Sequence, residues 1–151
     1  MLRQRLNEAL KQAMKARDAR AVSTLRLVLA ALKERDIAAR PRGVTDGVDE
    51  AEIVDMLQKM VRQRRESIAL YEQGNRPDLA KAEAEQIAII EAWLPRQLDE
   101  AELAAAVDAV VGELGAASLK DMGRVMAALK ERHAGQMDLA KAGARVKQKL
   151  G

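Results

Sequence analysis

Apolar residues recur three or four positions apart along almost the whole chain, which is the spacing of one face of an α-helix. The first segment shows it plainly, in an apolar stripe formed by Leu2, Leu6, Ala9, Leu10, Ala13 and Met14. No stretch alternates apolar and polar residues over the length of a strand, and Ala, Leu, Lys, Arg, Glu and Gln dominate the composition. The sequence therefore predicts an all-α protein.

Turn and cap residues divide this pattern into helical segments. Asp49 with Glu52, and Asp99 with Glu102, have the spacing of a capping box at a helix start. The fourth segment is expected to end before Pro95, because proline cannot continue a helix. The expected helices cover roughly residues 2–17, 19–39, 49–73, 79–93, 99–114, 118–135 and 138–150.

The length of the expected helices changes at Pro95: longer helices precede it and shorter ones follow it. We therefore expect two domains, covering residues 1–94 and 95–151. Short connections favour antiparallel neighbours. The first part is expected to be an amino-terminal bundle of about four helices, and the second a small tail domain of about three.

The apolar runs are short. The longest, Leu27 to Leu32, is far below the roughly 20 residues of a membrane-spanning helix, and Arg3 and Arg5 interrupt any signal-peptide core. A chain of 151 residues without cysteine can bury a core without disulfide bonds or bound metal. We expect a cytoplasmic protein that does not contact a membrane.

Charge is distributed unevenly, and aromatic residues are scarce. Residues 1–42 carry a local net charge of +7, residues 43–119 one of −9, and residues 120–151 one of +5. Tyr71 and Trp93 are the only aromatic residues. Since base-stacking platforms need aromatic side chains, any contact with nucleic acid is expected to depend on charge and shape.

Few residues offer catalytic chemistry. His133 is the only histidine, and its place before Ala134 and Gly135 is typical of the last turn of a helix, where a cation is favoured. None of the common nucleotide-binding, hydrolase or zinc-protease motifs occurs. We therefore predict no catalytic residue, no metal site and no cofactor, although whether the chain is an enzyme stays open.

Arg64 has an unusual position, because helical spacing places it in the apolar stripe of the third segment, beside Leu57, Met60 and Ile68. A buried guanidinium requires a partner. Either Arg64 forms a structural ion pair with another helix, or it faces a ligand in a groove between helices.

The basic residues of the tail form a sharper pattern. Lys120 and Arg124 fall opposite the apolar side of their helix, and Lys141, Arg145 and Lys149 line up four positions apart on the last helix. These cations are either ordinary solvated faces or a phosphate-binding surface. Gly123, inside a helical segment, indicates a close crossing of two helices.

Several short motifs match a known family. The most specific runs from Lys120 to Met126, with the sequence KDMGRVM, and is preceded by Leu94 to Leu98. Upstream, Arg62 to Ser67 and Gly74 to Ala80 also fit. Over nearly its whole length the chain resembles the GatB/YqeY family, which comprises the tail domain of the B subunit of glutamine-dependent aspartyl/glutamyl-tRNA amidotransferase and the free-standing YqeY-like proteins.

In that family the tail is a helical module that contacts tRNA. The resemblance implies tRNA contacts at Lys120 and Arg124, and the charge pattern adds Lys141, Arg145, Lys147 and Lys149. Position 136, often basic in the family, is Gln136 here, which removes one expected phosphate contact.

The resemblance also bears on activity. The catalytic domain of the amidotransferase has no counterpart in the sequence, so the family's carbon–nitrogen ligase label, with glutamine as amido-N-donor, is expected to be inherited from the larger enzyme. We expect a tRNA-associated accessory protein. The alternative is a protein-interaction module that docks onto an aminoacyl-tRNA-linked enzyme without touching RNA.

Overall fold

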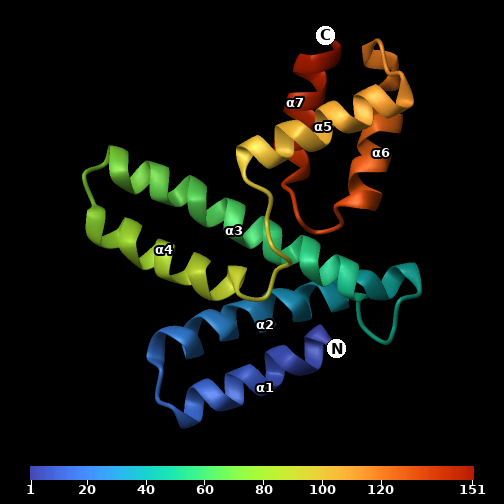
Figure 1. The fold of residues 1–151 in the computed structure, drawn as a ribbon. Helices are drawn as coiled ribbons and strands as arrows, with labels where there is room; N and C mark the ends of the chain where they lie inside the picture. Colours follow the sequence, from blue (N-terminus) through green and yellow to red (C-terminus); the bar gives the residue numbers. More distant parts are fainter. The chain divides into compact units, whose positions relative to one another are not determined.

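The computed structural model describes residues 1–151, and all its regular elements are helices. Seven α-helices occur, without a strand, which confirms the predicted all-α class. Each helix is too short or too polar to span a lipid bilayer. The chain divides into two compact units, Met1–Leu94 and Pro95–Gly151 (Figure 1).

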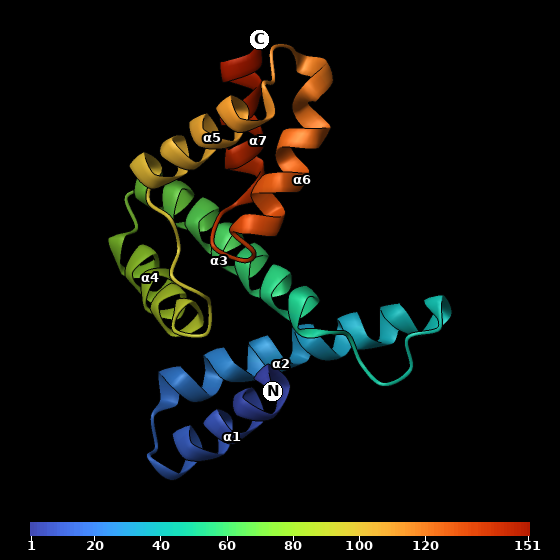
Figure 2. The same cartoon turned by 45° about the vertical axis from the view of Figure 1, so that its right-hand side comes forward.

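The first unit consists of two helical hairpins. Helices α1 (Leu2–Lys15) and α2 (Ala19–Ala39) form one, and α3 (Glu50–Gln73) and α4 (Pro77–Glu91) form the other (Figure 2). Helix α2 also packs against α4. The core between these helices is centred on the fully buried side chains of Leu6, Val28, Leu57 and Ile90.

Two helices of this unit end earlier than predicted. Helix α1 stops at Lys15, because Arg17 adopts the left-handed conformation, with φ of 55°, and turns the chain into α2. Helix α4 stops at Glu91, so Trp93 lies outside it. The indole of Trp93 packs against the core, and the Arg5 guanidinium carbon lies 5.2 Å from its ring centroid.

Side-chain caps begin the helices where the sequence predicts them. Asp99 accepts a hydrogen bond from the Glu102 amide, and Glu102 accepts one from the Asp99 amide, which confirms that capping box. Asp49 caps α3 by accepting from the Glu52 amide. The Glu52 carboxylate does not complete a box, because it lies 3.7 Å from Arg42 and 3.9 Å from Arg35.

The second unit contains α5 (Glu100–Leu114), α6 (Met122–Arg132) and α7 (Leu139–Leu150), each packed against the other two. Its core is lined by the fully buried Val107, Val125, Leu129 and Val146. The expected helix start at Ser118 is a 3₁₀ turn, Leu119–Asp121, that leads into α6.

Glycine positions correct one sequence-based prediction. A Cβ atom at Gly123 would meet nothing within 4 Å, so Gly123 does not mark a close helix crossing. Gly143 on α7 instead faces α6, because a Cβ there would lie 3.7 Å from the terminal methyl of Met122 and 3.9 Å from that of Met126. Both distances are ordinary van der Waals contacts, so neither glycine marks an unusually close helix crossing.

Candidate nucleic-acid interface

The cations predicted from the sequence differ in whether a carboxylate already neutralises them. Arg124 donates from Nη2 to Asp121 Oδ1 at 2.9 Å, one turn earlier in the chain. Lys149 Nζ lies 3.6 Å from Asp108 Oδ1 on α5. The other predicted contacts, Lys120, Lys141, Arg145 and Lys147, form no ion pair.

The cations of α7 do not share one surface. A rotation of about 100° per residue places Lys141 and Arg145 on the same face and Lys147 on nearly the opposite one. Ala142 and Val146, which are fully buried, separate these two sides. On α7, Lys141, Arg145 and Lys149 therefore lie on one side and Lys147 lies on the other, and Lys120 and Arg124 belong to the turn before α6 and to α6 itself.

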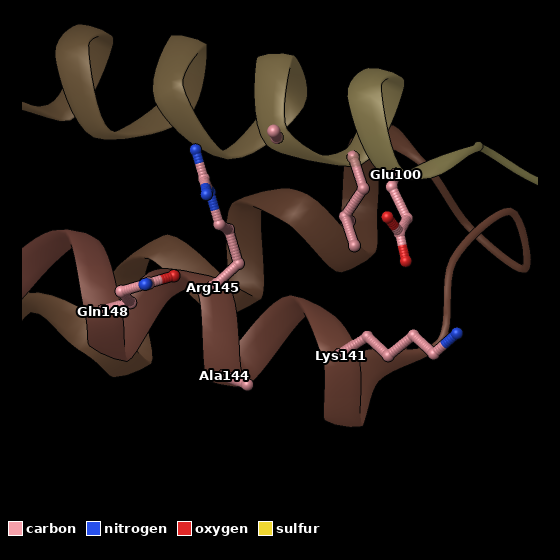
Figure 3. Close-up of a pocket in the computed structure, with 7 residues that line it drawn as sticks. Glu100, Lys141, Ala144, Arg145 and Gln148 are labelled. Atoms are coloured by element: carbon pink, nitrogen blue, oxygen red, sulfur yellow. The ribbon is translucent and has the colours of Figure 1, made fainter.

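A groove lies between α5 and α7, with a volume of about 450 Å³. Lys141, Ala144, Arg145 and Gln148 line it from α7. The wall on α5 consists of Glu100, Leu103 and Ala104. Figure 3 shows Arg145 extending from α7 toward α5, and Glu100 extending from α5 toward α7 near Lys141.

Arg145 is the most unusual side chain in this groove. Its Nε atom is buried and has no hydrogen-bond partner. An unsatisfied buried donor costs roughly 1–3 kcal/mol, and no carboxylate in this unit pairs with the guanidinium. The structure therefore leaves one donor of this guanidinium, the buried Nε–H, without a partner.

Sequence analysis predicted only part of this groove. The spacing of the basic residues indicated Lys141 and Arg145, but Glu100 and Gln148 were missed. One signal was available: Glu100, Leu103 and Ala104 are three and four positions apart, so they share a face of α5.

Carboxylates near the predicted contacts are held in the ionised form. Hydrogen bonds from the Ala117 amide, and then from Arg124, lower the pKa of Asp121. The Arg96 guanidinium donates two hydrogen bonds to Glu102, at 3.0 and 2.8 Å, and with the Asp99 amide lowers the pKa of Glu102 to about 2. At neutral pH, Asp121 and Glu102 are therefore ionised and remain paired with Arg124 and Arg96, respectively.

Arg64 lies in the first unit and is satisfied there. Its Nε donates to Gln86 Oε1 at 2.8 Å, its Nη1 donates to the Met60 carbonyl at 3.2 Å, and Glu83 Oε2 lies 4.0 Å away. The side chain is only 14% exposed. Because its partners are on α3 and α4, Arg64 links these two helices, and we do not include it in the candidate site.

No metal centre emerges from the geometry. The structure contains no cluster of three or more His, Asp or Glu side chains that could hold an ion. His133 occupies the carboxyl end of α6, where its backbone N–H donates to the Leu129 carbonyl.

Comparison with known proteins decides the family. The model of the family described as Yqey-like protein matches residues 3–150, almost the entire chain. The chain belongs to the YqeY-like family. This confirms the resemblance inferred from the short motifs, whose most specific segment, Lys120 to Met126, lies in the turn before α6 and its first turns.

Two relatives of this YqeY-like protein come from Eremothecium gossypii and Lachancea thermotolerans. The relative from Eremothecium gossypii is 37% identical over 112 residues, covering 72% of this chain and 58% of its own length. The relative from Lachancea thermotolerans is 33% identical over 111 residues, covering 72% of this chain and 57% of its own. The chain thus spans little more than half the length of these relatives.

Both relatives carry the name Altered inheritance of mitochondria protein 41, mitochondrial. Their mitochondrial designation contradicts the cytoplasmic localisation expected from the sequence, and that prediction is wrong. The physical reason is that composition and hydropathy report on folding and on membrane spans. The compartment of a protein is determined by targeting signals, which these properties do not describe.

Proposed function

We propose that this YqeY-like protein is a tRNA-associated accessory protein that binds RNA phosphates through its 95–151 unit. In this proposal residues 1–94 form the YqeY-like amino-terminal helical domain, and residues 95–151 form the GatB/YqeY-type tail. The observation that supports it is the absence of ion pairs at Lys120, Lys141, Arg145 and Lys147.

Unpaired cations matter because their charge is available to neutralise RNA phosphates. When a lysine or arginine binds a phosphate, the counterions condensed on the RNA are released, and the affinity falls as salt concentration rises. A cation already neutralised by a carboxylate must first lose that partner. Lys147 is therefore expected to contribute more to RNA binding than Lys149, whose Nζ lies 3.6 Å from Asp108.

The experiment compares these two lysines. The full chain and the variants Lys147→Gln and Lys149→Gln are titrated with bulk tRNA at several salt concentrations. The two substitutions are matched, because they remove the same side chain from the same helix two positions apart. Lys147→Gln is expected to lower the log–log salt slope by about one, and Lys149→Gln by clearly less.

The proposal fails if the full chain shows no salt-dependent binding to tRNA. It also fails if binding is retained but unchanged when Lys120, Lys141 and Lys147 are all replaced by glutamate. Circular dichroism of each variant establishes that the helices are intact, so that a loss of binding is not a loss of fold.

A second function is favoured by exposed apolar side chains on α2. Leu27 is 46% exposed and Ile37 is 48% exposed, although α2 is central to the first unit. Such residues suit a protein-interaction module that docks onto a tRNA-linked enzyme. Replacing both by serine would abolish that docking and leave the salt-dependent binding of tRNA unchanged, which distinguishes this function from the first.

A further inference from the structure

Helix α2 buries one face in the first unit and leaves the opposite face uncovered. Leu25, Val28 and Leu32 are buried in the core of that unit, whereas Leu27 and Ile37 are exposed to solvent. Figure 2 shows the carboxyl-terminal turns of α2 extending beyond α1 and α3. The uncovered face of α2 is therefore accessible to a binding partner.

This face has the residue spacing of a coiled-coil seam. Four exposed positions along it are separated by three, four and three residues, as the a and d positions of heptads are: Leu27, Ala30, Glu34 and Ile37. Three of these side chains are apolar, and the Glu34 carboxylate interrupts the apolar line. A second helix that packs along this line would bury the three apolar side chains.

A row of cations follows one edge of the line. Arg26, Lys33 and Arg40 are exposed and seven positions apart, so they occupy the g position of successive heptads. Arg40 keeps helical backbone angles, with φ of −56° and ψ of −44°, so the row extends to the end of the helix. None of the three forms an ion pair, whereas Arg35 on the same helix lies 3.1 Å from Asp55.

Charges at g positions set which helix can pair with this one, because they face charged residues on the flank of the partner. A row of unpaired cations favours a partner helix with acidic residues at the same spacing. A second copy of α2 in antiparallel packing would instead bring two rows of cations together. An RNA backbone would use the cations but leave Leu27 and Ile37 exposed. Charge and apolar surface together therefore favour an acidic helix.

We propose that the exposed face of α2 binds an acidic amphipathic helix of a partner protein. Apolar residues of the partner pack on Leu27 and Ile37, and its acidic residues pair with the row of cations. A cation of the partner lies opposite Glu34, because a carboxylate enclosed between two helices requires one. This inference rests on the second function proposed above, docking onto another protein, and adds the chemistry of the segment that docks.

The experiment uses two helical peptides of three heptads as probes. Both carry leucine at the a and d positions, except for one central lysine that faces Glu34. They differ only at the flanking e and g positions, which are glutamate in one peptide and lysine in the other. Binding of each labelled peptide to the full chain is measured by fluorescence anisotropy at one salt concentration.

The variants change the charge row and the apolar line separately. Lys33→Glu reverses one charge of the row. Lys11→Glu is its matched control, because Lys11 is an exposed lysine of α1 in the same unit and forms no ion pair. The double variant Leu27→Ser, Ile37→Ser removes most of the apolar surface. Thermal unfolding of each variant establishes that the first unit is folded.

The full chain is expected to bind the glutamate peptide about tenfold more tightly than the lysine peptide, because three exposed charge pairs change sign together. Lys33→Glu is expected to weaken binding of the glutamate peptide about threefold, and Lys11→Glu to leave it unchanged. The double serine variant is expected to lose binding of this peptide, because the apolar contact is removed.

The inference is overturned if the glutamate peptide does not bind the full chain. If both peptides bind equally and both are lost in the double serine variant, the face docks proteins without selecting charge. The second function then stands, and this inference fails.

Two other occupants give different results, and each would also overturn the inference. If Lys33→Glu weakens tRNA binding and the double serine variant does not, the row of cations contacts RNA. If sedimentation shows a dimer of the full chain that the double serine variant dissociates, a second copy covers this face. RNA binding by the 95–151 unit is decided separately, by the titrations of Lys147→Gln and Lys149→Gln.

Discussion

Arg3 and Asp36 form a two-pronged ion pair that joins α1 to α2. Arg3 Nη1 donates to Asp36 Oδ2 at 2.6 Å, and Nη2 donates to Asp36 Oδ1 at 3.0 Å. Nη2 also donates to the Val48 carbonyl, while the Val48 amide donates to Asp36. One pair of charges therefore holds α1, α2 and the loop that precedes α3.

Replacing Asp36 by Asn is expected to destabilise the first unit. The substitution removes the charge and weakens the hydrogen bonds of Arg3 and of the Val48 amide, at a cost of about 1–2 kcal/mol because the pair is partly exposed. Denaturant unfolding followed by fluorescence of Trp93 measures this, since Trp93 packs against the core of that unit. An unchanged midpoint would contradict the proposed role of the pair.

The same pair predicts how stability depends on pH. Hydrogen bonds from Arg3, and then from the Val48 amide, hold the pKa of Asp36 below its ordinary value. The folded state therefore binds this proton less tightly than the unfolded state, so the contribution is complete above the ordinary Asp pKa of about 3.9 and is lost as pH falls through the lower folded value. Asp36→Asn is expected to flatten the acid side of the stability curve.

Arg145→Met is expected to raise the stability of the second unit and to lower its affinity for tRNA. The substitution removes a buried Nε that has no partner and keeps the aliphatic part of the side chain, so the second unit gains about 1 kcal/mol. Affinity for tRNA falls at the same time. Thermal unfolding and tRNA titration of the same sample test both effects, and a loss of stability would show that the guanidinium contributes to folding.

Gly123→Ala is expected to stabilise the second unit by less than about 1 kcal/mol, because alanine favours a helix more than glycine does but Gly123 lies in the first turn of α6. Space allows it, since a Cβ at Gly123 meets nothing within 4 Å. Gly115→Ala is the control, because Gly115 has φ of 60° and alanine is strained there. It should destabilise the unit although space is equally open. The reverse order of stabilities in circular-dichroism melts would refute this account.

Features that depend on neighbours in the sequence were predictable. The Asp99–Glu102 capping box involves residues three positions apart, and the hydrogen bonds follow from the spacing alone. The apolar stripes likewise indicated the helices. The ends of α1 and α4 were less predictable, because the left-handed turn at Arg17 has no glycine to mark it.

The candidate site was predictable only in part. Spacing placed Lys141, Arg145 and Lys149 on one side of α7, but it could not show that Asp108 on α5 neutralises Lys149 and leaves Arg145 unpaired. The partner of Arg64, Gln86, is also on another helix. Both cases depend on which helices pack together.

The sequence by itself determined the helical class, the cap positions and the excess of positive charge after Asp121, because these follow from interactions within a few residues of the chain. The tertiary structure decided which cations stay unpaired and which residues line a groove. Glu100 and Arg145 are far apart along the chain, and only the packing of α5 against α7 places both in the lining of one groove.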